Sequence, residues 1–316
     1  MRVIRHLRLE PTRLPRVVLT LGNFDGVHRG HQAIVQRALA TAAPIGGQVV
    51  AVTFHPHPMA VLAPDRAPAS LQSLHDRLAL LRAQGVPVVV VQRFTAAFAQ
   101  LDPEAFVHEF LGQRLELRHV VVGYDVNFGR NRAGSAETLR VLGAAAGFAV
   151  DVVGAVQTED GLVVSSSSVR RALLAGEVDI VTKLLGRHHL LRGRVVAGDR
   201  RGRTLGFPTA NLHLPPRLLI PPDGVYAGWV PWDGRRIPAV LNIGVRPTFG
   251  VLRRTVEVHC LDFAADLYGQ WLGIELVARL RGEQKFAGPA ALTAQIQADV
   301  AHARVVLAAA SPTDAA

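Results

Sequence analysis

The 316-residue sequence contains one cysteine, Cys260, so no internal disulfide can form. A single cysteine is typical of proteins in the reducing cytoplasm, and we expect this protein to be cytoplasmic. Long hydrophobic runs are also absent, since none approaches the roughly eighteen residues that a membrane-spanning helix needs. The N-terminus, with Arg2, Arg5 and Arg8, lacks the hydrophobic core of a secretory signal. We therefore expect no membrane partner.

Lysine is nearly absent as well: Lys183 and Lys285 are the only two among 35 lysines and arginines. Against 25 acidic residues this gives a formal net charge of +10, which could suit nucleic acid. The arginines are scattered as pairs, such as Arg170-Arg171, without a block or a stripe interleaved with aromatic residues. We expect small polyanionic ligands and no nucleic acid. An RNA-binding protein with a degenerate nucleotide site is the alternative from another class.

What is present is a globular composition, with 49% hydrophobic and 19% charged residues, on a chain long enough for two domains. From Val17 to about residue 153, hydrophobic runs alternate with helical patterns that begin at Ser73, Asp102-Pro103 and Ser135. The runs predict buried parallel strands at residues 17–21, 48–54, 86–91, 119–122 and 148–153. This alternation favours a doubly wound α/β sheet, which binds ligands at the carboxyl ends of its strands.

After His188 the alternation stops and β-rich sequence with frequent turns begins. Strands are indicated at residues 190–197, 224–230, 237–243, 255–261 and 273–280. Asp233-Gly234 is a hairpin signal, and Pro289 opens a helix that runs to about Leu307. These elements predict a small closed β-barrel followed by a C-terminal helix. We place the boundary near residues 184–188, which gives domains 1–185 and 186–316.

The stretch from Leu21 to His31, Leu-Gly-Asn-Phe-Asp-Gly-Val-His-Arg-Gly-His, joins the first predicted strand to a helix. Gly22, Gly26 and Gly30 allow the backbone to turn tightly and to approach a ligand closely. A helix start suits a phosphate, and His28 and His31 could both donate hydrogen bonds to it. The spacing matches neither a Walker loop nor the glycine pattern of dinucleotide folds. A zinc pair or a plain structural turn are the alternatives.

Three more loops follow predicted strands and should face the same crevice. Residues 54–58 present His57 between two prolines, and residues 123–134 form a loop rich in glycine and arginine. Residues 163–171 place serines and Arg170 at another helix start, where they could bind phosphate, although such a run is more often a solvated loop.

The predicted barrel has its own glycine- and arginine-rich loop, residues 198–211. Thr209 and Asn211 offer neutral oxygens, which suit a Mg²⁺ ion that keeps several waters. Glycines recur every four residues in this loop, at Gly198, Gly202 and Gly206. Alone, such a loop in a β domain is weak evidence for a site.

Gly-x-Phe-Asp-Gly-x-His-x-Gly-His, ending at His31, resembles the nucleotidylyltransferase superfamily, and Pro-Thr-Ala-Asn, ending at Asn211, resembles the flavokinases. Flavokinase-like motifs follow in the same order at residues 222–227, 242–250, 256–259, 266–269 and 283–286. Almost the entire chain thus resembles the bacterial bifunctional riboflavin kinase/FAD synthetase family. Two departures are Val126, where the family usually has Phe, and Ser167, where Thr is common.

The resemblance implies that the barrel makes FMN from riboflavin and ATP, and that the α/β domain makes FAD from FMN and a second ATP. It implies His28, His31, Arg170 and Glu257 as catalytic residues, and Thr209 and Asn211 as Mg²⁺ ligands. ATP for adenylyl transfer would contact Gly22, Phe24, Asp25, His28, His31, Asp125, Ser167 and Arg170. ATP for the kinase would contact Gly198, Gly202, Gly206, Pro208, Thr209 and Asn211. The alternative is a nucleotidylyltransferase for another phosphate ester with a flavin-binding regulatory barrel, and a homo-oligomer stays open.

Glu257 is the candidate general base of the kinase step. The strand at residues 255–261 alternates, so Val256, Val258 and Cys260 should share one face and Glu257 with His259 the other. Most strand carboxylates are simply solvated, which is the plain alternative. Asp262 and Asp266 are the local rivals, at or beyond the strand end.

Overall fold

The computed structural model describes residues 1–7, 13–198, 202, 206–248 and 251–310. Its contacts divide the chain into two compact units, Met1–Ser166 and Ser167–Ala315. Each unit is described by itself below.

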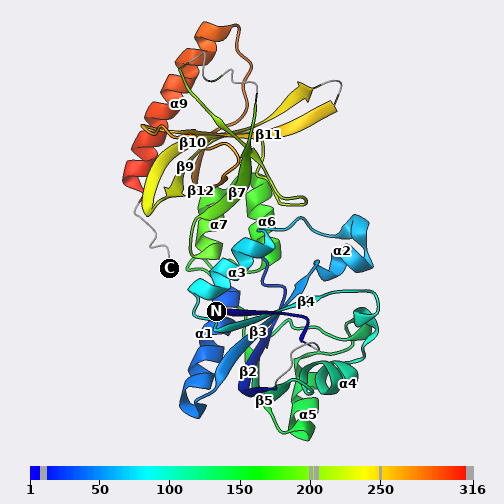
Figure 1. Ribbon diagram of the computed structural model, residues 1–316. Helices are drawn as coiled ribbons and strands as arrows, with labels where there is room; N and C mark the ends of the chain where they lie inside the picture. The colour runs from blue at the N-terminus through cyan, green and yellow to red at the C-terminus, as the bar shows by residue number, and fades with distance from the viewer. Residues whose placement is uncertain (8–12, 199–201, 203–205, 249–250, 311–316) are drawn as a thin grey trace. The chain divides into compact units, whose positions relative to one another are not determined.

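The first unit contains a parallel six-stranded sheet in the order β1-β4-β3-β2-β5-β6 (Figure 1). Its strands are β1 (Arg2–Arg5), β2 (Leu14–Leu21), β3 (Gln48–His55), β4 (Val88–Arg93), β5 (Leu115–Gly123) and β6 (Ala149–Val153). Its helices are α1 (Arg29–Ala42), α2 (Pro58–Leu62), α3 (Leu74–Ala83), α4 (Pro103–Ala105), which continues as a π-helix (Phe106–Leu111), and α5 (Ala136–Ala146). Short 3₁₀ turns lie at Ala43–Ile45, Pro64–Arg66, Phe98–Gln100 and Arg130–Arg132.

Both faces of this sheet are buried, because successive strand residues feed two separate cores. Val17 and Leu19 of β2 pack with Phe106 and Phe110 of the π-helix, while Val18 packs with the helix α1 on the opposite face. The same alternation holds along β3 and β4. Near-continuous hydrophobic runs are therefore what the strands require, and the doubly wound α/β class is confirmed.

The second unit is a closed barrel in the order β10-β11-β8-β7-β12-β9. Its strands are β7 (His189–Val196), β8 (Ala210–His213), β9 (Gly224–Trp232), β10 (Arg235–Thr248), β11 (Val251–Cys260) and β12 (Trp271–Arg281). Its helices are α6 (Ser166–Ala175), which starts at the last residue of the first unit, α7 (Val178–Leu185) and α9 (Pro289–Ala309). The expected barrel with a C-terminal helix is confirmed. Helix α9 packs against β9, β10 and β12, and the Arg281–Asp299 ion pair at 2.7 Å ties it to the barrel.

Local sequence signals account for several element ends. Ser73 and Asp102 cap α3 and α4 by accepting hydrogen bonds from backbone N–H groups three residues on. Asp233 (φ 47°) and Gly234 (φ 71°) form the turn between β9 and β10, as the hairpin signal indicated. Two strands were not predicted from the sequence: β1, which is short and mostly exposed, and β8, which carries Asn211.

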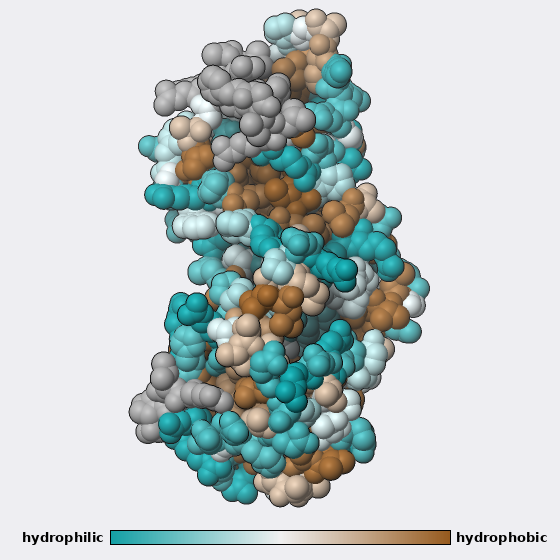
Figure 2. Space-filling model, turned by 90° about the vertical axis from the view of Figure 1, so that its right-hand side faces the viewer, coloured by the Kyte–Doolittle hydropathy of each residue, from teal (hydrophilic) through white to brown (hydrophobic). Residues whose placement is uncertain are grey.

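Helix α7 contacts β7 and β12, and its Val178 belongs to the barrel core. The contacts divide the chain at the first residue of α6, upstream of the position at which the sequence pattern changes. On the face drawn in Figure 2, hydrophilic side chains alternate with separate hydrophobic patches. Within the described ranges, no helix is both long and hydrophobic enough to cross a membrane.

Candidate active sites

The glycine-rich loop leaves the carboxyl end of β2 at the centre of the sheet and leads into α1. Its turn places Phe24, Gly26 and Val27 at φ values of 48°, 89° and 40°. Positive φ is strained for Phe and Val, so the surroundings must hold the loop in place. Both side chains are buried, at 1% exposure each, in the core between the sheet and α1. The chain is thus forced to turn sharply just before the helix starts.

His28 and His31 lie together at the start of α1, with their rings stacked 3.7 Å apart at 20°. His28 is the N-cap, and its Nδ1 accepts a hydrogen bond of 3.4 Å from the backbone N–H of His31. In the neutral ring, that bond places the proton on Nε2. Gly30 lies close to His28: a Cβ there would lie 3.2 Å from the His28 ring, so the ring would have to shift.

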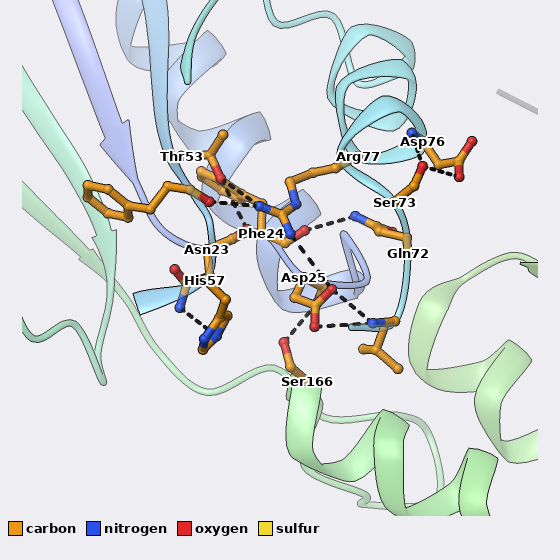
Figure 3. Close-up of polar contacts among 12 residues, drawn as sticks. Asn23, Phe24, Asp25, Thr53, His57, Gln72, Ser73, Asp76, Arg77 and Ser166 are labelled. Atoms are coloured by element: carbon orange, nitrogen blue, oxygen red, sulfur yellow. Dashed lines mark hydrogen bonds and ion pairs between the residues drawn. The ribbon is translucent and has the colours of Figure 1, made fainter. Parts of the chain in front are cut away.

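Asp25 is buried, with 2% of it exposed, and lies among Gln72, Arg77 and Ser166 (Figure 3). Its two carboxylate oxygens accept hydrogen bonds from the backbone N–H of Leu71 at 3.1 and 3.2 Å. Its own carbonyl accepts a 2.8 Å bond from the Ser166 hydroxyl. Gln72 also donates to the carbonyl of Phe24 at 3.0 Å. Asp25 therefore fixes the loop to neighbouring segments.

Arg77 of α3 completes this network from the other side (Figure 3). Its guanidinium donates to the hydroxyl of Thr53 at 3.2 Å and to the carbonyl of Phe54 at 3.3 Å, and it lies 4.0 Å from Asp25. Thr53 in turn donates to the carbonyl of Asn23 at 3.1 Å. Burial lowers the pKa of Arg77, and the charge of Asp25 opposes that shift. Arg77 could not be predicted as part of this network, since a helical arginine is normally exposed.

The remaining residues that were predicted to contact ATP lie outside this network. Gly22 precedes the turn, and Asp125 is exposed in the loop after β5, the neighbour of β2. In that loop Val126 packs against the sheet core, and Tyr124 is exposed. Ser167 is exposed and Arg170 half-buried on α6, and both are described with the second unit.

In the barrel, Glu257 of β11 pairs in register with Asn211 of β8 on one side and with Asn242 of β10 on the other. Glu257 is buried, with 8% exposed, and its Oε2 lies 3.4 Å from the hydroxyl of Thr209. Val256, Val258 and Cys260 point into the barrel core, as the alternation predicted. The carboxylate is thus on the other face, beside Thr209 and Asn211.

The backbone passes close to Thr209 and Asn211, and it can do so because two of its residues are glycines. A Cβ at Gly198 would lie 2.3 Å from the Asn211 amide, and one at Gly202 would lie 2.3 Å from the carbonyl of Phe207. His259, on the same face as Glu257, has its Nδ1 2.7 Å from the carbonyl of Pro208.

Gly198 and Pro208 therefore lie close against β8 and β11. Gly206 has φ 86° and open space around it. The arginines at 200, 201 and 203 lie outside the described residues.

The two rival carboxylates near Glu257 have other partners. Asp262 is exposed and pairs with Arg304 of α9 at 2.7 Å, and this hydrogen bond lowers the pKa of Asp262. Asp266 accepts a 3.1 Å bond from the backbone N–H of Tyr268. Both stabilise the turn after β11, and Glu257 alone of the three lies beside Thr209.

The fold and the two loops define a class of enzyme: a nucleotidylyltransferase-like α/β unit and a flavokinase-like barrel on one chain. A family model described as FAD synthetase matches residues 10–168, and one described as riboflavin kinase matches residues 185–307. The bifunctional riboflavin kinase/FMN adenylyltransferase of Pseudomonas fluorescens is 43% identical, over 92% of this chain and 93% of that protein. Its namesake from Escherichia coli K12 is 41% identical, over 91% of each.

This chain belongs to the bifunctional riboflavin kinase/FMN adenylyltransferase family. A solved structure from Streptococcus pneumoniae, titled macrolide-efflux protein, is also similar, with a TM-score of 0.85 and 31% identity. The similarity covers 96% of this chain and 99% of that one, so both halves of the fold recur there.

Proposed function

We propose that the two activities of this enzyme divide between residues 1–185 and 186–316. The enzyme phosphorylates riboflavin with ATP to give FMN and ADP. It then transfers the AMP part of a second ATP to the phosphate of FMN, which gives FAD and releases pyrophosphate. The order of the two matched family models along the chain supports this division.

For adenylyl transfer, the FMN phosphate is already an anion and needs no base when it attacks the α-phosphorus of ATP. The work of the protein is to position the triphosphate and to stabilise charge on the departing pyrophosphate. The stacked His28 and His31 at the start of α1 offer N–H donors there, together with the positive end of the helix. Arg170 and Ser167 would add contacts to the phosphates, and Gly22, Phe24, Asp25 and Asp125 would shape the ATP site.

For the kinase, a hydroxyl of riboflavin must lose a proton as it attacks the γ-phosphorus, so a base is needed. Glu257 is the candidate, and the observation that carries it is its position: a buried carboxylate beside Thr209 and in register with Asn211. ATP would lie along the loop of Gly198, Gly202, Gly206 and Pro208.

Mg²⁺ fits this barrel site. Thr209 and Asn211 supply a hydroxyl and an amide oxygen next to the Glu257 carboxylate, all of them oxygen donors of the kind Mg²⁺ prefers. Across the described part of the chain, no group of three or more His, Cys, Asp or Glu side chains could hold a metal by itself. An ion at Thr209 and Asn211 would therefore rely on water and on ATP phosphates, and it would supply charge neutralisation during transfer.

Exchange of single residues in each half tests both the division and the roles. Glu257→Gln keeps the shape but removes the proton acceptor, so riboflavin phosphorylation should fall by about a hundred- to ten-thousandfold. Adenylylation of added FMN should be unchanged. Asp262→Asn is the matched control, because it removes a neighbouring carboxylate that pairs with Arg304.

His28→Ala and His31→Ala should produce the reverse pattern, with adenylylation reduced by about a hundred- to a thousandfold and the kinase intact. Flavins separated by chromatography after incubation with ATP and Mg²⁺ give both rates. Near-normal phosphorylation by Glu257→Gln, with a large loss in Asp262→Asn, would reassign the base.

A further inference from the structure

Three neighbouring strands of the α/β sheet end in a basic residue. Arg5 is the last residue of β1, Arg93 of β4 and His55 of β3. These strands are adjacent and parallel, and His55 and Arg93 are direct register partners. Their ends therefore gather at one edge of the sheet, where His6 follows Arg5 (Figure 1 shows β3 and β4 side by side).

These four side chains line one cavity of about 190 Å³, together with Pro56, Leu74 and Val91. The volume is well above the roughly 10–15 Å³ that a single water needs, so a hydrated or multi-atom anion can enter. No residue of the glycine-rich loop and no residue of the barrel lines it.

All the titratable side chains that line the cavity are basic. None of its lining residues is a carboxylate, and among the described residues no ion pair joins Arg5, His6, His55 or Arg93 to one. Burial lowers the pKa of His55, and the charges of Arg77 and Arg5 lower it further. Positive charge that no carboxylate of the described residues pairs with raises the local concentration of anions.

We propose that this cavity is an anion site that binds a phosphate group, separate from both ATP sites. Two arginine guanidiniums and two imidazoles match the donors that phosphate recognition uses. The site adjoins the adenylylation loop, because Pro56 lines the cavity and the next residue, His57, has its Nε2 3.3 Å from the Asn23 amide. Free pyrophosphate or phosphate, or the phosphate ester of FMN, could supply the group.

The test follows the His55 ring by NMR in the full-length protein without nucleotide, its signal being assigned with His55→Gln. Phosphate, pyrophosphate and FMN are each titrated against chloride at matched ionic strength. A bound anion favours the protonated imidazole, so the His55 titration midpoint should rise and the shift should saturate. Saturation by either inorganic ion identifies a free-anion site, and saturation by FMN alone identifies a phosphate-ester site.

Arg5→Ala/Arg93→Ala should weaken the binding by about tenfold, because two charge-assisted contacts at a partly exposed site are lost. Arg82→Ala/Arg140→Ala removes the same charge from exposed positions elsewhere in this unit, and it should bind as the natural protein does. A His55 response that chloride reproduces, or an affinity that is unchanged in Arg5→Ala/Arg93→Ala, would overturn the proposal.

Discussion

Replacing Arg77 by Met tests whether the buried Asp25–Arg77 network holds the adenylylation loop. The Arg77 side chain is 5% exposed and that of Asp25 is 2% exposed, so Met fills similar space but leaves a carboxylate buried without its counter-charge. Breaking such a pair typically costs about 3–5 kcal/mol. We expect the lower end, about 3 kcal/mol, because Asp25 keeps its two bonds from the N–H of Leu71. For a unit of this size, that is a fall in Tm of about 6–12 °C.

Calorimetry of the full chain measures the shift, and flavin analysis below the transition measures the two activities. Adenylylation should fall, because Phe24 and Val27 need the surrounding network to keep their positive φ, while the kinase serves as an internal control. Arg82→Met, at an exposed position of the same helix, should shift Tm by less than about 2 °C. Asp25→Asn combined with Arg77→Met should cost less than the sum of the single changes. A shift for Arg77→Met no larger than that for Arg82→Met would refute the reasoning, as would strict additivity.

Two further predictions concern packing and pH. Gly30→Ala places a Cβ 3.2 Å from the His28 ring and should reduce adenylylation without affecting the kinase, whereas Gly154→Ala, with open space around it, should change neither rate. Burial, and then a neighbouring arginine charge, lower the pKa of His189 to about 4 from 6.5. Below pH 6.5 the His189 side chain therefore binds a proton in the unfolded chain but not in the folded chain. The free energy of unfolding consequently falls as the pH drops towards 4, by about 3 kcal/mol in total. Thermal melts from pH 7 to pH 4.5 should show a flatter dependence in His189→Gln, and equal slopes would contradict the assignment.

Strands β2 to β5 could be predicted because burial on both faces demands hydrophobic runs, and all four have them. β6 was also predicted, although it lies at the sheet edge and none of its residues is buried. β1 could not be predicted, since its four residues include two arginines and only Ile4 is buried. Its place at the sheet edge follows from pairing with β4, a contact between segments more than eighty residues apart in sequence.

The site residues divide in the same way, into those whose position follows from local sequence patterns and those whose position depends on tertiary contacts. His28 and His31 could be placed at a helix start because capping and glycine patterns are local. The inward direction of Asp25 could not be predicted, because it is set by the backbone of Leu71 and by Arg77, far along the chain. Glu257 was correctly placed on the face opposite the barrel core, since strand alternation is local, but its burial depends on β8, which the sequence did not reveal as a strand.

Helix α7 leads to a last prediction, about where the kinase half can be separated. The sequence pattern changes near residue 186, yet Val178 of α7 lies in the barrel core, where it is 2% exposed. A fragment of residues 186–316 would lose this contact and uncover core surface, which costs about 1.5–3 kcal/mol for a fully buried side chain of this kind. A fragment of residues 167–316 keeps α6 and α7. We expect both to lack adenylylation, and the longer one to melt at a higher temperature and to phosphorylate riboflavin at the full-chain rate. Equal thermal stability of the two fragments would show that α7 contributes nothing to the barrel, and FAD formation by either would refute the division of the activities.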